Sequence, residues 1–267
     1  MNYSFPRNGL SSLAGQNREI KNDILLVYAD EKAGSDLARS IIYEIVDVET
    51  VLFLSGGRTP IRLYSQLAED NRLNIGAAGM VDERYGKPMH RYSNELTFVR
   101  SGLTDFFKNK KITFYPILND DQSLEITARN YDQKVNYLLD HFSKSVAVLG
   151  IGEDGHIAGI APDRADFNNP LFSPGRSELL VSYFADPLPL AVDETSISPH
   201  GFGERITMTF KGLAKIDVLI VLTFGENKRA ALSSLFTEGP ISQVPARFLK
   251  SGLVANKTII ITNQNPE

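Results

Sequence analysis

The chain has 267 residues, of which 42% are hydrophobic and 22% charged, and its formal net charge is −4. This apolar content suffices for a sizeable core and excludes a disordered chain, whereas the slight negative charge argues against a nucleic-acid-binding protein, which needs a basic face. The absence of cysteine excludes disulfides, thiolate metal sites and cysteine nucleophiles.

Apolar runs alternate with amphipathic stretches from about residue 24 onward. Strand-like runs occupy residues 24–29, 50–54, a run ending at 80–81, 111–115, 146–151, 178–184, 205–210, 217–224 and 258–262; helical stretches cover 31–46, a segment ending at 67, and 123–142. Helices between strands imply crossover connections, and therefore a mostly parallel sheet covered on both faces. We predict a three-layer, modified Rossmann-like α/β fold.

The sequence contains no internal repeat, low-complexity tract or obvious linker. We therefore expect an N-terminal extension over 1–22 and a single α/β domain over 23–267, with a proline-rich, loop-rich excursion at 163–203. No run reaches the roughly 18 apolar residues of a membrane span, and the N-terminal residues lack the apolar segment of a signal peptide. A cytoplasmic protein with no membrane partner is the expectation.

Residues 146–162 read VAVLGIGEDGHIAGIAP, a buried strand pattern that breaks into glycines. Because ligands collect at the carboxyl ends of parallel strands, the polar residues of this segment are candidates for chemistry. Asp154 and His156 flank Gly155, whose backbone can turn sharply and approach a ligand. Histidine is a suitable general base near neutral pH. The alternative interpretation is an Asp-Gly turn with an incidental histidine.

The turn after residues 50–54 reads Ser55-Gly56-Gly57-Arg58-Thr59-Pro60. Two glycines allow backbone N–H groups to converge on an anion, and Thr59 with Pro60 suits the cap and start of a helix. The turn therefore resembles a phosphate cradle in outline. It lacks the lysine and spacing of a P-loop, so nucleotide binding is not indicated. A plain strand-to-helix turn is the alternative.

Residues 82–85, DERY, follow another strand-like run. Arg84 is suited to hold a phosphate bidentately, and Asp82 to bind sugar hydroxyls or move a proton, whereas a solvated loop with an ion pair is the alternative. Arg205 opens the run at 205–210, and Lys228 follows the run at 217–224. Both cations lie at element ends, where they could complete a phosphate pocket.

These pieces together resemble the 6-phosphogluconolactonases, within the group that includes the glucosamine-6-phosphate deaminases. The matching segments, in family order, are SGGRTP, DERY with His90 and Ser93-Asn94, GIGEDGHIAGIAP, ERITMT, GENKRAAL and Val244-Pro245-Ala246. The resemblance implies the three-layer α/β fold of that group, with the active site over the strand ends. It departs from the usual lactonase pattern at Arg58, in DGHIAG, and over 200–203.

A few positions favour the lactonases over the deaminases. The deaminase motif continues from DGHIA into Phe-Asn-Glu-Pro, whose glutamate is associated with sugar-ring opening, whereas Ala161 stands at that place here. An alanine cannot transfer a proton. DERY is also similar to the lactonase form, because the deaminases usually lack the arginine.

The resemblance implies hydrolysis of 6-phospho-D-glucono-1,5-lactone to 6-phosphogluconate, a step of the pentose phosphate pathway, with no cofactor or metal. His156 would activate water, Asp82 would orient sugar hydroxyls or His156, and the glycine turn with Arg84, Arg205 and Lys228 would hold the phosphate. A zinc site is not indicated by the four histidines, His90, His141, His156 and His200, which include no His-x-x-x-His pair.

Two other functions stay open at this stage. One is aldose–ketose isomerisation with or without deamination, in which Asp82 would act on a substrate proton. The other is a phosphosugar-binding domain without turnover, which would have no need of His156 and Asp154. The sequence also leaves open whether the chain is a monomer or a homodimer.

Overall fold

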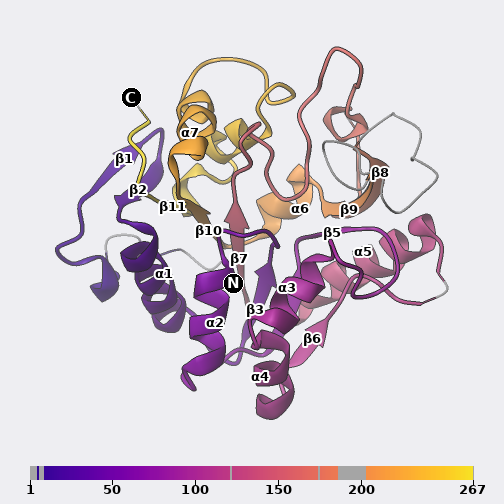
Figure 1. The fold of residues 1–267 in the computed structure, drawn as a ribbon, viewed down its shortest axis with the longest axis horizontal. Coiled ribbons are helices and arrows are strands. Elements are labelled where there is room, and N and C mark those ends of the chain that lie inside the picture. Colours follow the sequence, from indigo (N-terminus) through magenta and orange to yellow (C-terminus); the bar gives the residue numbers. More distant parts are fainter. Residues whose placement is uncertain (1–4, 6–8, 121, 174, 186–202, 267) are drawn as a thin grey trace.

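One large sheet organises this computed structural model, which describes all residues except 1–4, 6–8, 121, 174, 186–202 and 267 (Figure 1). Within the described chain its strands lie in the order β1 (Arg18–Lys21), β2 (Ile24–Tyr28), β11 (Thr258–Thr262), β10 (Val218–Thr223), β7 (Lys144–Gly150), β3 (Thr50–Leu54), β4 (Ala77–Met80) and β6 (Thr113–Tyr115). Neighbouring strands are parallel except for β1 with β2.

The central strands are buried on both faces. Every residue of β3, β10 and β11 is buried, as their aliphatic sequences without alternation predict. The helices that connect the strands are α1 (Glu31–Ile45), α2 (Ile61–Glu69), α3 (Asn94–Arg100), α4 (Leu103–Lys110), α5 (Leu124–His141), α6 (Phe210–Lys215) and α7 (Arg229–Phe236). The predicted mostly parallel α/β fold is confirmed.

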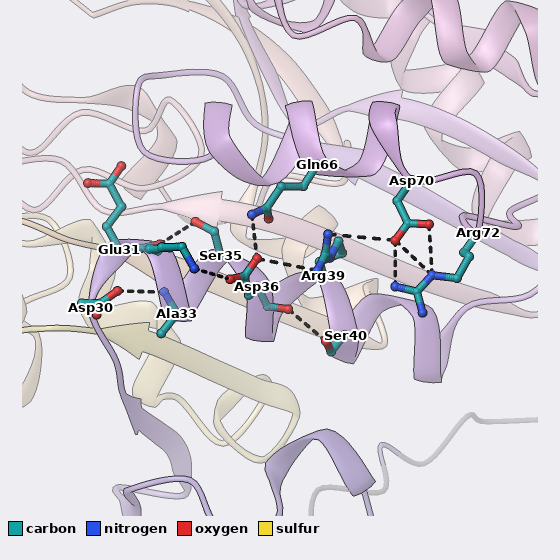
Figure 2. Close-up of polar contacts among 11 residues, drawn as sticks. Asp30, Glu31, Ala33, Ser35, Asp36, Arg39, Ser40, Gln66, Asp70 and Arg72 are labelled. Atoms are coloured by element: carbon teal, nitrogen blue, oxygen red, sulfur yellow. Dashed lines mark hydrogen bonds and ion pairs between the residues drawn. The ribbon is translucent and has the colours of Figure 1, made fainter.

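Polar contacts tie α1 to α2, which carries the glycine turn at its start (Figure 2). Asp30 caps α1 by accepting a hydrogen bond from the Ala33 N–H. Along the same helix, Asp36 Oδ1 accepts a hydrogen bond of 2.7 Å from Gln66 Nε2 of α2. The two helices therefore keep a defined register beside the sheet.

A second, antiparallel sheet differs from the sequence-based expectation. It consists of β5 (Asp82–Arg84), β9 (Glu204–Met208) and β8 (Leu180–Phe184), and it contacts α5 and α6 (Figure 1). The sequence pattern predicts no strand at 82–85 and counts 178–184 and 205–210 among the strands of one sheet. That prediction was wrong because the chain leaves the large sheet at Val81, and residues 82–84 then pair with β9.

The N-terminal residues that the structure describes pack against the α/β unit. Residues 18–21 form the edge strand β1, Leu13 is fully buried, and Glu44 of α1 accepts hydrogen bonds from the Ser11 and Ser12 N–H groups. The excursion 163–203 contains β8, and its residues 186–202 lie outside the described part of the chain. None of the helices in the described ranges has the length and apolar content to cross a bilayer.

The strands β3 and β7 are parallel neighbours in the sheet, but the chain adds its later strands on opposite sides of this pair. From β3 the chain crosses to β4 on one side, whereas from β7 it proceeds to β10 on the other. In open α/β sheets, ligands bind at the carboxyl ends of the strands beside such a switch point. The turn beginning at Ser55 and the segment 151–162 follow these two strands, so both lie at this switch point.

Candidate active site

The turn after β3 is tied to both neighbouring strand ends. The Ser55 N–H donates to Val148 O at 3.0 Å, and Ser55 Oγ donates to Asp82 Oδ1 at 2.6 Å. Gly57 has φ of +92°, which explains the glycine there. Thr59 is not the helix cap that the sequence suggests, because α2 begins at Ile61 with Pro60 at the N-cap and no side-chain hydrogen bond. Arg58 is exposed.

Asp82 and Arg84 are joined through Asn94, a residue that the sequence identifies only as part of a motif. Asn94 Nδ2 donates to both Asp82 O and Asp82 Oδ2, at 2.8 and 3.0 Å. Asn94 Oδ1 accepts a hydrogen bond of 2.9 Å from an Arg84 guanidinium nitrogen, which also donates to Tyr92 O. The amide therefore bridges the predicted carboxylate and the predicted phosphate-binding arginine.

Glu83 lies on the opposite face of β5 from these two residues, as strand alternation requires, and is only 1% exposed. Its carboxylate accepts hydrogen bonds from the Arg84, Asn94 and Glu95 N–H groups and from Ser93 Oγ, at 2.7 to 3.0 Å. Burial raises the pKa of Glu83 to about 7, against the opposing effect of these hydrogen bonds. Glu83 thus accepts hydrogen bonds from two N–H groups of the first turn of α3, those of Asn94 and Glu95.

Asp154 and His156 form a close pair in the loop after β7. His156 Nδ1 lies 2.6 Å from Asp154 Oδ1, and the His156 N–H donates to the same oxygen at 3.1 Å. Burial by itself raises the pKa of Asp154, but hydrogen bonding and the charge of His156 outweigh it and hold that pKa well below its usual range. Asp154 is therefore ionised at neutral pH. The His156 side chain is 39% exposed.

Glycines shape this loop. Gly155 has φ of +82°, and its carbonyl accepts a hydrogen bond of 2.9 Å from the Ala246 N–H. A Cβ at Gly152 would overlap the imidazole of His156, so only glycine leaves room for the ring in this position.

The rest of the loop packs on one face of the small sheet. The carbonyl of Gly159 accepts hydrogen bonds from Tyr183 Oη at 2.6 Å and from Arg205 Nη1 at 3.5 Å, and Thr207 Oγ1 donates to Ala158 O. A Cβ at Gly159 would lie 2.9 Å from Asp82 Cβ. The small sheet therefore brings Asp82 and Arg205 to the loop that carries His156.

Two arginines are direct neighbours on adjacent strands of the small sheet. Arg84 of β5 is the direct cross-strand partner of Arg205 of β9, and Arg205 is only 9% exposed. Like charges in directly opposite positions destabilise a sheet, and this pair lies on the face that also carries Asp82. The same alternation places Thr207 opposite Asp82.

Lys228 is half-buried in a short 3₁₀ turn, Glu226–Lys228, that precedes α7. Its neighbour Asn227 donates from Nδ2 to Glu153 Oε1 at 2.6 Å, which links this turn to the loop after β7.

The other histidines lie elsewhere. His90 contacts the backbone of Arg84, with Nε2 lying 3.0 Å from Arg84 O, and burial lowers the pKa of His90. His141 is exposed on α5, and His200 lies outside the described residues.

Sequence reasoning missed Asn94, Tyr183 and Thr207 as members of the site. A signal existed for two of them, because the strand run at 178–184 and the run at 205–210 alternate, so that Tyr183, Arg205 and Thr207 share a face once they pair. Glu83 and Glu153 also make defined hydrogen bonds. Within the described residues, no three His, Asp or Glu side chains are grouped to hold a metal.

Comparison with known sequences relates this site to a family of sugar-phosphate enzymes. The family described as glucosamine-6-phosphate isomerases/6-phosphogluconolactonase matches residues 30–259. A 6-phosphogluconolactonase of Xylella fastidiosa is 30% identical over 188 residues, covering 68% of this chain and 70% of the relative. A glucosamine-6-phosphate deaminase of Clostridium beijerinckii is 28% identical over 244 residues, covering 84% and 91%.

Solved structures share the fold. A 6-phosphogluconolactonase from Shewanella baltica superposes with a TM-score of 0.69 at 19% identity, covering 94% of this chain and 100% of that one. A monomeric glucosamine-6-phosphate deaminase gives a TM-score of 0.61 at 19% identity, covering 89% and 96%. With the family match over most of its length, this chain belongs to the glucosamine-6-phosphate isomerase/6-phosphogluconolactonase family.

Proposed function

We propose that this protein hydrolyses 6-phospho-D-glucono-1,5-lactone to 6-phosphogluconate. The observation that carries the proposal is the accessible imidazole of His156, paired with ionised Asp154 at the switch point of the sheet. The 6-phosphogluconolactonases named among the relatives support the choice of substrate. The substrate is a small soluble anion, so neither a nucleic acid nor a membrane has a part in the reaction.

The Asp154 contact selects the form of the imidazole. Because Asp154 is ionised, the proton of the neutral ring belongs on Nδ1, from which it donates to the carboxylate. Nε2 is then the basic nitrogen. Asp154 also stabilises the imidazolium that forms when Nε2 accepts a proton, which is the role of the carboxylate in a hydrolytic triad.

The reaction balances with one imidazole. His156 Nε2 removes a proton from water as the water oxygen attacks the lactone carbonyl, and a tetrahedral oxyanion forms. Collapse of this intermediate breaks the bond to the ring oxygen, which leaves as a hydroxyl after receiving the proton from His156. The product is an open-chain acid that ionises to 6-phosphogluconate. No step requires a cofactor or a metal ion.

The phosphate is assigned to the arginine pair of the small sheet. A dianion between Arg84 and Arg205 relieves their repulsion and is held by charge-assisted hydrogen bonds. The N–H groups of Gly56 and Gly57, with Lys228 and Arg58, are further contacts in this proposal. Binding energy at the phosphate then places the carbonyl carbon against the base.

Asp82 is assigned to the sugar hydroxyls. Its carboxylate is held by Ser55 Oγ and by the amide of Asn94, so its orientation is fixed before substrate binds. It lies on the sheet face shared with Arg84 and beside Gly159 in the loop of His156. This arrangement orients the lactone ring with respect to the base.

Ala161 separates this proposal from deaminase chemistry. Its methyl group is buried, and its N–H donates to Tyr183 Oη at 3.0 Å, so this position offers no carboxylate for ring opening. Lactone hydrolysis needs only the base that His156 supplies, whereas sugar-ring opening and isomerisation need additional proton transfers.

The test compares two substrates with the same protein. Lactone hydrolysis is followed by coupling to 6-phosphogluconate oxidation against a no-enzyme blank, because the lactone also hydrolyses spontaneously. Glucosamine 6-phosphate is assayed in parallel for ammonia release. We expect a lactone rate well above the blank and no ammonia. Ammonia release instead would identify a deaminase, and saturable binding of 6-phosphogluconate with neither turnover would identify a binding domain.

A further inference from the structure

Asn94 occupies the junction between the two halves of the proposed site. It is the first residue of α3, only 1% exposed, and its side chain passes between β5 and the turn after β3. A Cβ at Gly56 would overlap the Asn94 amide, so the turn and this side chain are packed in direct contact. No other described residue bonds the side chains of both Asp82 and Arg84.

The side-chain amide of Asn94 acts both as a hydrogen-bond donor and as an acceptor. Nδ2 donates to the backbone and side-chain oxygens of Asp82, and Oδ1 accepts from Arg84. Only a group with a donor and an acceptor can satisfy a carboxylate and a guanidinium together. A carboxylate of the same shape would keep the contact with Arg84 but would repel Asp82, and a methyl group would keep neither.

The backbone of Asn94 is anchored from the other side of β5. Glu83 Oε1 accepts hydrogen bonds from the N–H groups of both Asn94 and Arg84, at 2.7 Å each. Ser93 Oγ donates to Glu83 Oε2 at 2.8 Å. The start of α3 is therefore attached to the strand that carries Asp82 and Arg84, and Asn94 has little freedom to move relative to them.

We propose that Asn94, anchored on the buried carboxylate of Glu83, is a positioning residue that holds Asp82 and Arg84 in a fixed relation before substrate binds. The inference rests on the proposed lactonase function and adds to it the residue that sets the geometry between the sugar end and the phosphate end of the site. Preorganisation of this kind matters because misplacement of a catalytic or binding group by about 1 Å costs on the order of 100-fold in rate.

The experiment measures kcat/KM for lactone hydrolysis, blank-corrected, in Asn94→Ala and Asn94→Asp. We expect Asn94→Ala to lose about tenfold to 100-fold, because Asp82 and Arg84 both lose their partner. Asn94→Asp, although nearly isosteric, should lose at least as much, because its second oxygen faces the oxygens of Asp82. A packing role predicts the reverse order, with the isosteric variant close to wild type.

The matched control is Ser123→Ala. Ser123 caps α5 by accepting a hydrogen bond from the Ile126 N–H, at the N-terminus of a helix as Asn94 is, and no hydrogen bond among the described residues joins its side chain to Asp82 or Arg84. We expect its kcat/KM to stay within about twofold of wild type, with only the modest stability loss of a missing cap. Folding of every variant is checked by cooperative urea unfolding, and if Asn94→Ala does not fold, Asn94→Asp carries the test.

The outcomes separate this inference from the function on which it rests. A folded Asn94→Ala within about twofold of wild type, or a wild-type-like Asn94→Asp beside a weakened Asn94→Ala, would overturn the positioning role and leave the lactonase proposal intact. A wild-type protein no faster than the blank would overturn both. Losses in both Asn94 variants, with Ser123→Ala unaffected, support it.

Discussion

Glu83 and Asp154 show how the hydrogen-bond partners of a carboxylate decide the direction of its pKa shift. Burial by itself raises the pKa of both Glu83 and Asp154. Glu83 accepts hydrogen bonds only from neutral donors, and its pKa remains raised, whereas Asp154 has the imidazole of His156 beside it, and its pKa falls below the usual range. Glu83 anchors the start of α3, and Asp154 is an ionised partner of the His156 imidazole.

Glu83 makes stability depend on pH. The native pKa of Glu83, about 7, exceeds its unfolded value of about 4.5. Between these two pH values the native state keeps a proton on Glu83 that the unfolded state has lost. The contribution of Glu83 to stability is complete below about pH 4.5, and about 3 kcal/mol of it is lost as pH rises to 7.

The measurement is urea unfolding of wild type and Glu83→Gln at pH 5 and pH 8. The glutamine of this variant does not titrate, so we expect the stability advantage of wild type over the variant to shrink by about 2 to 3 kcal/mol at the higher pH. Glu49→Gln, at an exposed position, controls for loss of a charge. An advantage that is the same at both pH values would refute the assignment.

At the residue level, proximity in sequence decided what could be predicted. Asp154 and His156 are two positions apart, so their pairing follows from one turn. Ser55 and Asp82 are far apart in sequence, yet both follow strands of a parallel sheet, and the sequence could assign them to one edge. The contact of Asn94 with Asp82 depends on how α3 packs, which no local pattern reveals.

Among the elements, the turn after β3 is specified by packing as much as by backbone conformation. Gly57 needs its glycine for a positive φ, whereas Gly56 needs it because a side chain would overlap Asn94. The sequence suggested a single reason, close approach to an anion, for both residues. The structure shows a second reason at Gly56, because Asn94 at the start of α3 packs directly against the turn.

Gly56→Ala should therefore disturb the site through Asn94. The added methyl group must displace a buried amide, and overpacking of this kind costs about 1–3 kcal/mol of stability, together with a loss of kcat/KM that resembles that of Asn94→Ala. Urea unfolding and lactone kinetics measure the two effects. Gly252→Ala, where a Cβ meets nothing within 4 Å, is the matched control, and equal behaviour of the two variants would contradict the packing explanation.

The strand β5 illustrates a limit of pattern reading for elements. Residues 82–84 are all polar or charged, and such a run is typical of a loop. They form a strand because Glu83 finds hydrogen-bond donors on one face while Asp82 and Arg84 bond the Asn94 side chain on the other. These tertiary contacts override local propensity here.

For the whole molecule, the central relation is between the two sheets. The large sheet supplies the switch point and the loop of His156, and the small sheet supplies Asp82, Arg84 and Arg205. Tyr183 joins them, because its hydroxyl donates to Gly159 O and accepts from the Ala161 N–H. The sequence predicted the large sheet well, since uninterrupted aliphatic runs specify it, but alternation in short strands did not reveal that they form a sheet of their own.

Tyr183→Phe tests this connection. The variant leaves the buried Ala161 N–H without its acceptor and leaves Gly159 O with only the 3.5 Å contact from Arg205. We therefore expect the free energy of unfolding to fall by about 1–3 kcal/mol and kcat to fall as the loop of His156 loses its support. Tyr137→Phe, on the exposed surface of α5, is the control. A Tyr183→Phe protein that is as stable and as active as this control would show that the sheets are held together by other contacts.

The measurement that tests the account most directly is the blank-corrected kcat/KM for 6-phosphogluconolactone in wild type, His156→Ala and His141→Ala. Removal of a general base costs about 10²- to 10⁴-fold, so we predict a loss of that size at His156 and wild-type activity at the exposed His141. A folded His156→Ala enzyme that hydrolyses the lactone as fast as wild type would contradict the assignment of His156 as the base.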